Sequence, residues 1–203
     1  MTINEYFDKV ICINLDRRRD RWEHVQQECE KWKIQVERFD AHDLGTLGNH
    51  GCTASHRGVL ELISHHKWPR TLILEDDFVV IRSDFENMFD RVIHKVPEDW
   101  EMLYLGAHYA EKPRARINEH VILAGHLKTT SSYALTYLAA RQIVTTIEGG
   151  TPIDELMRIP NQTMRCYVTQ PRLFAQYDNF SDLQKRQCNN RLCMEDTAHE
   201  NMV

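Results

Sequence analysis

The sequence lacks any long apolar run and carries no excess of positive charge. No stretch approaches the ~18 consecutive apolar residues that a membrane-spanning helix needs. Residues 1–8 include Glu5 and Asp8 and no apolar run, so we expect no signal peptide and a cytoplasmic location. Lys and Arg number 25 and Asp and Glu number 30, which gives a net charge of −5. This balance argues against a nucleic-acid binder and against adhesion to anionic lipid.

The sequence also lacks the spacings of several common sites. Its six cysteines include no C-x-x-C pair, so we expect reduced thiols, and its 11 histidines include no H-x-x-x-H pair, so zinc is not indicated. There is no G-x-G-x-x-G and no G-K-[S/T] segment. Dinucleotide-dependent oxidoreductases and P-loop ATPases are therefore disfavoured.

The alternation of strand and helix signals predicts an α/β fold. Short apolar runs predict strands at 9–15, 34–39, 71–74, 102–105, 121–123, 130–135 and 164–168. Helical spacing predicts helices such as 53–66 and one that starts at Ser83, with Glu86 completing a capping box. The segments 40–52 and 106–119 are expected to be loops. This rhythm is typical of a mostly parallel sheet with helices on both faces, in a single domain over 1–183 with a polar tail over 184–203.

Three adjacent carboxylates follow one predicted strand. The segment 72–78 reads LILEDDF, so the apolar run leads directly into Glu75, Asp76 and Asp77. Ligands of open α/β sheets bind beyond the carboxyl ends of the strands. Crowded carboxylates raise one another's pKa values, and Mg²⁺ or Mn²⁺ offsets that repulsion. The residues alone leave two interpretations open: a metal that bridges to a diphosphate, or a charged turn.

A cluster of arginines follows the first predicted strand. Residues 14–21 read NLDRRRDR. Arginines near a helix N-terminus suit phosphate, and Asp16 can accept a hydrogen bond from a base or a ribose hydroxyl. For Arg19 and Arg21 the alternative is a solvated helix surface.

Together these segments resemble glycosyltransferase family 25, which includes bacterial lipooligosaccharide galactosyltransferases and collagen hydroxylysine galactosyltransferases. The similar segments occur in the family's order over about residues 8–183. They are 10–21, 48–63 with its Gly-Cys-x-x-Ser-His pattern, 72–78, 133–141 followed by 151–154, and finally 170–171 and 181–182.

The resemblance implies a GT-A-type fold and inverting transfer of a hexose, galactose or glucose, from a UDP-sugar to a hydroxyl of a glycan or hydroxylated protein, as in lipopolysaccharide biosynthesis. It implies Mn²⁺ or Mg²⁺ on Glu75 and Asp77. Donor contacts are expected from Asn14, Asp16, Arg17, Arg18, Ser55, His56, Asp76 and Asp182. Ser55 and His56 are expected at a helix start, where a serine is more often simply a cap.

An inverting single displacement needs a base for the acceptor hydroxyl. Asp154 and Glu155, after Pro152 at an expected helix start, are the candidates. The alternative for Asp154 is a helix N-terminal residue stabilised by the helix dipole. The family sometimes completes its metal site with a histidine, for which His108, His126 and His199 are available.

Two other functions stay open. One is a non-catalytic descendant of the same fold that binds a sugar nucleotide or a partner. The other is a metal-dependent phosphohydrolase, which is disfavoured because an Asp-x-Asp-x-Thr run would be expected after the first strand.

Overall fold

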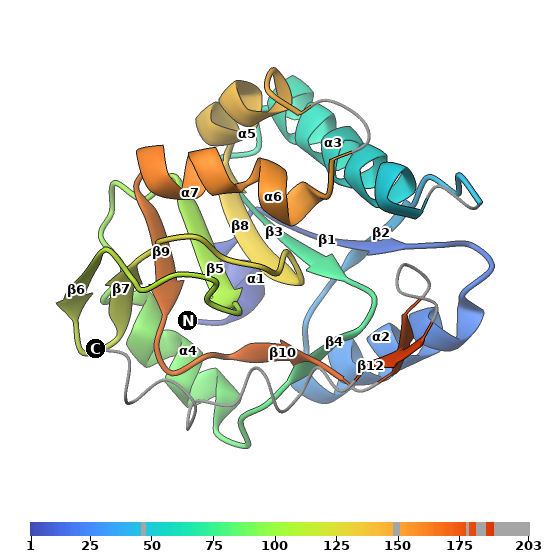
Figure 1. Ribbon diagram of the computed structural model, residues 1–203. Helices are drawn as coiled ribbons and strands as arrows, with labels where there is room; N and C mark the ends of the chain where they lie inside the picture. The colour runs from blue at the N-terminus through green and yellow to red at the C-terminus, as the bar shows by residue number, and fades with distance from the viewer. Residues whose placement is uncertain (46–47, 148–150, 178, 182–185, 189–203) are drawn as a thin grey trace.

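The protein folds around one large sheet between two layers of helices (Figure 1). The structure is a computed structural model that describes residues 1–45, 48–147, 151–177, 179–181 and 186–188. Within these residues eight strands form the main sheet, in the order β2-β1-β3-β8-β5-β9-β7-β6. They are β1 (Lys9–Asn14), β2 (Glu37–Asp40), β3 (Arg70–Glu75), β5 (Met102–Gly106), β6 (Ala115–Asn118), β7 (Val121–Leu123), β8 (Ser132–Thr136) and β9 (Cys166–Thr169).

Two small antiparallel pairs and a set of helices complete the described chain. The pairs are β4 (Phe78–Val80) with β10 (Phe174–Gln176), and β11 (Asn179–Ser181) with β12 (Arg186–Cys188). The helices are α1 (Ile3–Tyr6), α2 (Arg19–Trp32), α3 (Gly48–His66), α4 (Phe85–Ile93), α5 (Tyr137–Val144), α6 (Ile153–Leu156) and α7 (Arg158–Thr163). None of the described helices is both long and apolar enough to cross a membrane.

The main sheet is mostly parallel, as the sequence predicts. β1 pairs in parallel with β2 and with β3, and β5 pairs in parallel with β9. β8 is antiparallel to both β3 and β5, and β7 is antiparallel to both β9 and β6. Six of the eight strands therefore run in one direction, and β8 and β7 run against them.

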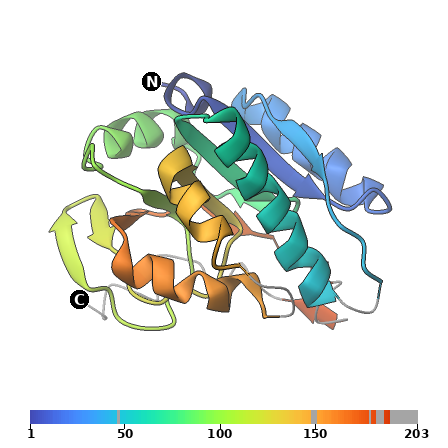
Figure 2. The same ribbon diagram turned by 90° about the horizontal axis from the view of Figure 1, so that it is seen from above.

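The apolar run of β3 follows from its cover on both faces. Leu72 and Leu74 pack into the core with residues of α1, α2 and α4, whereas Ile73 packs into the core with residues of α3 and α5. Successive side chains of a strand point to opposite faces, so a strand that is covered twice is apolar throughout. Figure 2 shows α3 and α5 side by side over the sheet. The predictions of an α/β fold, of helices on both faces and of a single domain are confirmed.

Several local predictions are wrong. α3 begins at Gly48 rather than 53, so only part of 40–52 is loop, and residues 115–118 inside the expected 106–119 loop form β6. The second strand is Glu37–Asp40, shifted from 34–39. α4 has Asp84 as its N-cap, without a capping hydrogen bond from that side chain to the described chain, so the Ser83 capping box does not form. Most of the 184–203 tail lies outside the described residues.

The glycine at position 51, inside α3, has a steric reason. A Cβ placed on Gly51 would lie 2.5 Å from the backbone oxygen of His42. Glycine therefore lets the first turns of α3 approach the segment after β2 closely, which a side chain would prevent. The glycines of the 40–52 segment suggest a loop in the sequence, but Gly51 lies in α3 and allows this close packing.

Candidate active site

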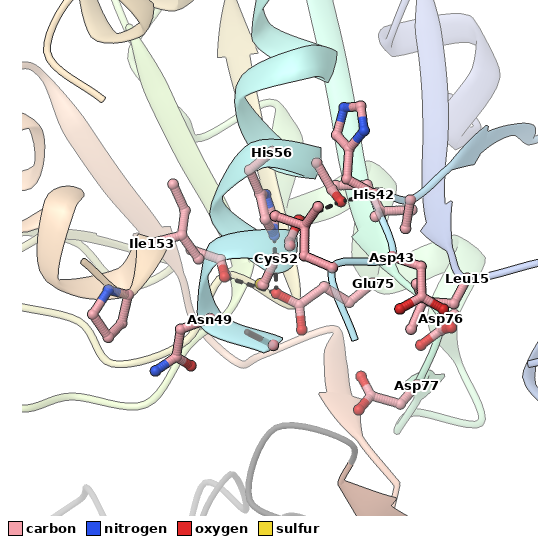
Figure 3. A pocket seen from close by; sticks show the side chains of 18 of the residues that line it. Leu15, His42, Asp43, Asn49, Cys52, His56, Glu75, Asp76, Asp77 and Ile153 are labelled. Carbon is pink, nitrogen blue, oxygen red and sulfur yellow. Dashed lines mark hydrogen bonds and ion pairs between the residues drawn. The ribbon is translucent and has the colours of Figure 1, made fainter. Parts of the chain in front are cut away.

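A cavity of about 530 Å³ opens beyond the carboxyl ends of β1, β2 and β3 (Figure 3). This is the sheet edge at which α/β proteins bind ligands, and the volume suits a small-molecule substrate. The described lining includes Ile13, Leu15, Arg17 and Arg21 near β1, Ala41–Gly45 after β2, residues of α3 from Gly48 to His56, Glu75–Asp77 after β3, Lys128–Thr130 before β8, Pro152–Asp154 at α6, and Gln176 of β10.

The middle carboxylate, Asp76, lies in a buried ion pair. Its Oδ1 lies 2.5 Å from Nη1 of Arg21, and its Oδ2 accepts a hydrogen bond of 2.8 Å from Asn14 Nδ2. Burial raises the pKa of Asp76, and the nearby Arg21 opposes that shift without cancelling it. The structure therefore directs Asp76 toward β1 and α2.

Glu75 is held at both carboxylate oxygens. Thr130 donates a hydrogen bond of 2.7 Å to Oε1, and Nε2 of His56 lies 3.3 Å from the same oxygen. Gln176 Nε2 lies 3.3 Å from Oε2. Burial alone would raise the pKa of Glu75, but the contacts with His56 and Thr130 outweigh it and hold that pKa below its ordinary value.

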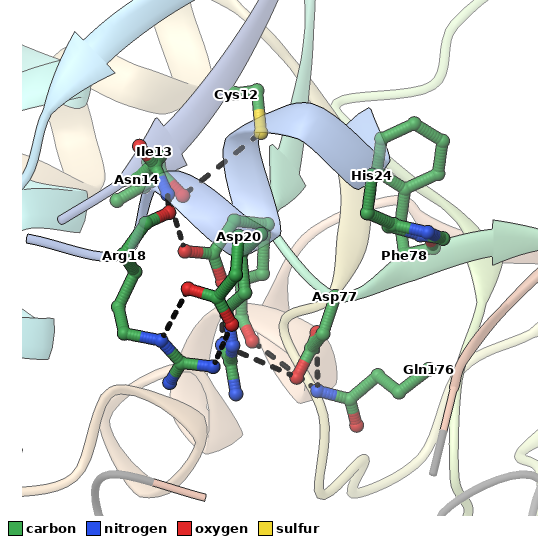
Figure 4. A network of polar contacts seen from close by, with 12 residues as sticks. Cys12, Ile13, Asn14, Arg18, Asp20, His24, Asp77, Phe78 and Gln176 are labelled. Carbon is green, nitrogen blue, oxygen red and sulfur yellow. Dashed lines mark hydrogen bonds and ion pairs between the residues drawn. The ribbon is translucent and has the colours of Figure 1, made fainter. Parts of the chain in front are cut away.

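Asp77 shares Gln176 with Glu75. Gln176 Nε2 donates to Asp77 Oδ1 at 3.1 Å (Figure 4). Arg21 Nη1 lies 3.7 Å from Asp77 Oδ2. Burial, with the charge of Glu75 adding to it, raises the pKa of Asp77 from 3.8 to about 7. Glu75 and Asp77 thus direct oxygen atoms toward one point, which the Gln176 amide nitrogen occupies.

The donor set of Glu75 and Asp77 fits a hard divalent cation. Both offer carboxylate oxygens, the ligands that Mg²⁺ and Mn²⁺ prefer. In the described part of the chain no three His, Cys, Asp or Glu side chains converge on one metal position. Mg²⁺ is commonly held by one or two carboxylates together with substrate phosphates and water, so two carboxylates suffice.

The arginine cluster after β1 divides between the cavity and the surface. Arg17 lines the cavity and forms an ion pair of 2.6 Å with Asp43 from the segment after β2. Arg18 instead pairs with Asp20 at 2.9 Å, and the exposed Asp16 lies 3.3 Å from Arg38. The cavity lining, over the described residues, includes neither Arg18 nor Asp16.

Two further residues of this segment are buried. Asn14 is 1% exposed and contacts Asp76 rather than the cavity. Arg21 is also buried and lines the cavity, so the alternative of a solvated helix surface is wrong for Arg21, whereas the exposed Arg19 fits that alternative.

Ser55 and His56 line the cavity, but they do not start a helix. They lie in the interior of α3, which begins at Gly48. Ser55 donates a hydrogen bond of 2.6 Å to the Gly51 carbonyl and accepts one of 2.8 Å from the backbone N–H of His42. Ser55 therefore joins α3 to the segment after β2 instead of capping a helix.

Asp154 and Glu155 lie differently, although they are neighbours in α6. Asp154 is half-buried and lines the cavity, and burial raises its pKa. Glu155 is exposed, lies outside the described lining, and has its Oε2 3.7 Å from His126 Nε2. Asp182 and His199 lie outside the described residues.

The sequence reasoning missed several cavity residues. Gln176 ends a strand of three residues that was not expected, so nothing marked it. Thr130 was included in a predicted strand, and it instead precedes β8 and donates to Glu75. His42, Asp43 and Lys128 come from segments that follow or precede strands, and their polar character was the available signal.

The fold and the cavity define an α/β protein with three carboxylates in a cavity at the carboxyl edge of its sheet. The model of glycosyltransferase family 25 (LPS biosynthesis protein) matches residues 44–157, more than half of the chain, and the protein belongs to this family. The predicted family is confirmed, and the mostly parallel α/β architecture agrees with the GT-A-type fold that the resemblance implied.

The relatives of this chain include proteins with and without described activity. It is 26% identical over 209 residues to the human "Inactive glycosyltransferase 25 family member 3", covering 83% of this chain and 35% of that protein. It is 26% identical over 193 residues to the mouse "Procollagen galactosyltransferase 2", and this match covers 75% of this chain and 30% of that protein. The chain thus spans about a third of the length of these relatives.

A solved structure of similar fold is A197 from STIV. It has a TM-score of 0.50 and 11% identity, and the match covers 90% of this chain and 94% of that one. At this identity the similarity shows the fold alone.

Proposed function

We propose that this protein is a metal-dependent glycosyltransferase that moves a hexose from a UDP-sugar to a hydroxyl of a glycan or protein acceptor, with inversion. The observation that carries the proposal is the cavity wall on which Glu75 and Asp77 converge, with Asp154 from α6 in the same lining. Membership of family 25 supports the same reaction class.

Glu75 and Asp77 are the residues that would hold Mn²⁺ or Mg²⁺. When bound, such an ion acts as a Lewis acid on the departing diphosphate. The lining offers Arg17, Arg21 and Lys128 as cationic side chains near the same space. The N-terminal turn of α3, which begins at Gly48, adds backbone N–H groups that favour phosphate.

Asp154 is the base in this proposal. Its carboxylate takes the proton of the acceptor hydroxyl as the acceptor oxygen bonds to the anomeric carbon and the bond to the diphosphate breaks. A pKa raised by burial makes Asp154 a stronger base than an exposed aspartate. Glu155, which is exposed and lies beside His126, is not assigned this step.

Release of UDP from UDP-galactose and UDP-glucose, with MnCl₂ and candidate acceptors, tests this function. Asp77→Asn should lower kcat/KM by about 10²-fold or more, as expected when a charge that stabilises the transition state is lost. Asp20→Asn is the matched control, because Asp20 is exposed and pairs with Arg18. Absence of binding of either donor with Mn²⁺, or full activity of Asp77→Asn, would contradict the proposal.

The second candidate is a non-catalytic protein that binds a sugar nucleotide. It is favoured by the relatives whose descriptions call them inactive, among them the human protein above. Calorimetric titration with UDP separates the two, because this candidate requires binding of UDP without turnover of any donor.

A further inference from the structure

His56 lies at the centre of a buried chain of contacts behind the acidic wall. The residue is 1% exposed and comes from α3. Its Nδ1 atom lies 2.9 Å from the hydroxyl of Tyr133 in β8. Its Nε2 atom lies 3.3 Å from Oε1 of Glu75 at the end of β3 (Figure 3). Three different elements of the fold meet at this ring.

The contacts of the ring favour one tautomer. Burial raises the pKa of Tyr133 well above its ordinary value, so this side chain keeps its O–H proton. A hydrogen bond from that O–H to Nδ1 leaves Nε2 as the N–H nitrogen, facing a carboxylate oxygen. The opposite tautomer would face a nitrogen lone pair toward Glu75 Oε1, which is repulsive. Tyr133 therefore selects the form of His56 whose Nε2–H faces Glu75, at an ion-pair distance of 3.3 Å that falls short of hydrogen-bond geometry in this structure.

The consequence reaches the cavity through the other oxygen of Glu75. Oε1 is approached by His56 and by the Thr130 hydroxyl, which fixes the carboxylate in one orientation. The other oxygen, Oε2, lies 3.3 Å from Nε2 of Gln176. The same nitrogen lies 3.1 Å from Oδ1 of Asp77. The orientation of Glu75 thus sets where its second oxygen meets Asp77.

We propose that His56 is a positioning residue, which together with Tyr133 orients Glu75 so that its Oε2 converges with Asp77 on a divalent cation. This inference rests on the proposed function in that it takes Glu75 and Asp77 as the metal-binding pair. From the sequence, His56 is expected to contact the nucleotide. In this proposal His56 instead contributes by orienting Glu75. Residues that orient metal ligands in this way commonly change metal affinity by about 10- to 100-fold when removed.

The neighbouring Tyr104 provides a matched control. Tyr104 and Tyr133 are both fully buried, and their rings stack with centroids 5.7 Å apart. The Tyr104 hydroxyl donates to Oδ1 of Asn161 at 3.2 Å, whereas the Tyr133 hydroxyl contacts His56. A Phe substitution removes one buried hydroxyl in either case, and only Tyr133→Phe removes the partner of His56.

The first test is the affinity for Mn²⁺, measured on the full chain by electron paramagnetic resonance of MnCl₂ with saturating UDP. Tyr133→Phe should weaken binding by about tenfold and His56→Leu by about 10- to 100-fold, whereas Tyr104→Phe should leave it unchanged. His56→Gln, whose amide N–H can donate in place of Nε2, should recover most of the loss. Equal effects of the two tyrosine substitutions, or no rescue by Gln, would overturn the proposal.

The second test needs neither metal nor altered packing. Nitrogen-15 NMR of the His56 ring in the metal-free wild-type protein should show the neutral form protonated at Nε2. A ring protonated at Nδ1 would overturn the proposal.

The two tests separate this inference from the proposed function. If wild-type protein binds no Mn²⁺, the metal-dependent function fails, and the NMR result still decides the tautomer. If wild-type protein binds Mn²⁺ and Tyr133→Phe binds it equally well, the positioning role alone fails.

Discussion

Replacing Asp77 with Asn should stabilise the metal-free protein at neutral and alkaline pH, but not in acid. The cause is burial, together with the charge of Glu75, which raises the pKa of Asp77 from 3.8 to about 7. The folded state then binds the Asp77 proton more tightly than the unfolded state does. The stability that this tighter proton binding contributes to the folded state is fully present below about pH 4 and is lost as the pH rises through about 7.

The magnitude follows from that shift. About three pKa units at about 1.4 kcal/mol each give up to about 4 kcal/mol of lost stability by pH 8. Asn keeps the size of the side chain and can still accept from Gln176, but it carries no charge to desolvate. The free energy of unfolding of Asp77→Asn should therefore exceed that of wild type by up to about 4 kcal/mol at pH 8 and match it near pH 4.

The adjacent Asp76 gives a graded comparison. Burial also raises its pKa, but its carboxylate pairs with the buried Arg21 at 2.5 Å. Asp76→Asn removes a desolvated charge and leaves that guanidinium without its main counter-charge, so it should raise the free energy of unfolding at pH 8 by less than Asp77→Asn does.

The assay is urea unfolding, followed by circular dichroism in EDTA between pH 4 and 8. In a separate series without EDTA, added Mn²⁺ should stabilise wild type, by about 2.7 kcal/mol at a hundred times its dissociation constant, and should not stabilise Asp77→Asn. A gain for Asp77→Asn that does not change with pH, or a gain for Asp76→Asn as large as that for Asp77→Asn, would refute the reasoning.

Three further predictions concern the base, the buried arginine and helix α3. In a UDP-release assay, Asp154→Asn should lower kcat by about 10²- to 10⁴-fold; Glu155→Gln should lower it far less, and equal losses would contradict the assignment of the base. Arg21→Met should lower the free energy of unfolding by about 3–5 kcal/mol, whereas Arg19→Met on the exposed side of α2 should change it by less than about 0.5 kcal/mol. Gly51→Ala places a Cβ 2.5 Å from a backbone oxygen after β2 and should lower both the melting temperature and UDP affinity, so an unchanged melting curve would count against this packing.

The elements that the sequence predicts best are those covered on both faces. β3 and β5 each contain an apolar run, 72–74 and 102–105, because helices cover both of their sides, and such runs are visible without knowing their partners. β4 and β10 were not expected, since each has three residues and forms only when the other is present. Their pairing depends on residues almost a hundred positions apart, which local patterns do not report.

The candidate site shows the same division. The acids at 75–77 were visible as a run after a strand, but their different environments were not. Asp76 differs from Asp77 because Arg21 reaches it from α2. The signal for a buried Arg21 was its spacing to Val25 and Cys29, the other buried residues of α2, at i+4 and i+8.

The antiparallel strand β8 has a consequence for the order in which the chain can fold. β8 lies between β3 and β5, and Arg70 of β3 pairs with Thr136, which comes 66 residues further along the chain. During synthesis, β3 therefore emerges with one edge whose backbone N–H and C=O groups stay unpaired until β8 follows. Exposed edges of this kind favour pairing between chains. A nascent chain that ends before residue 132 should consequently depend on chaperones and aggregate more readily than one that extends past residue 136.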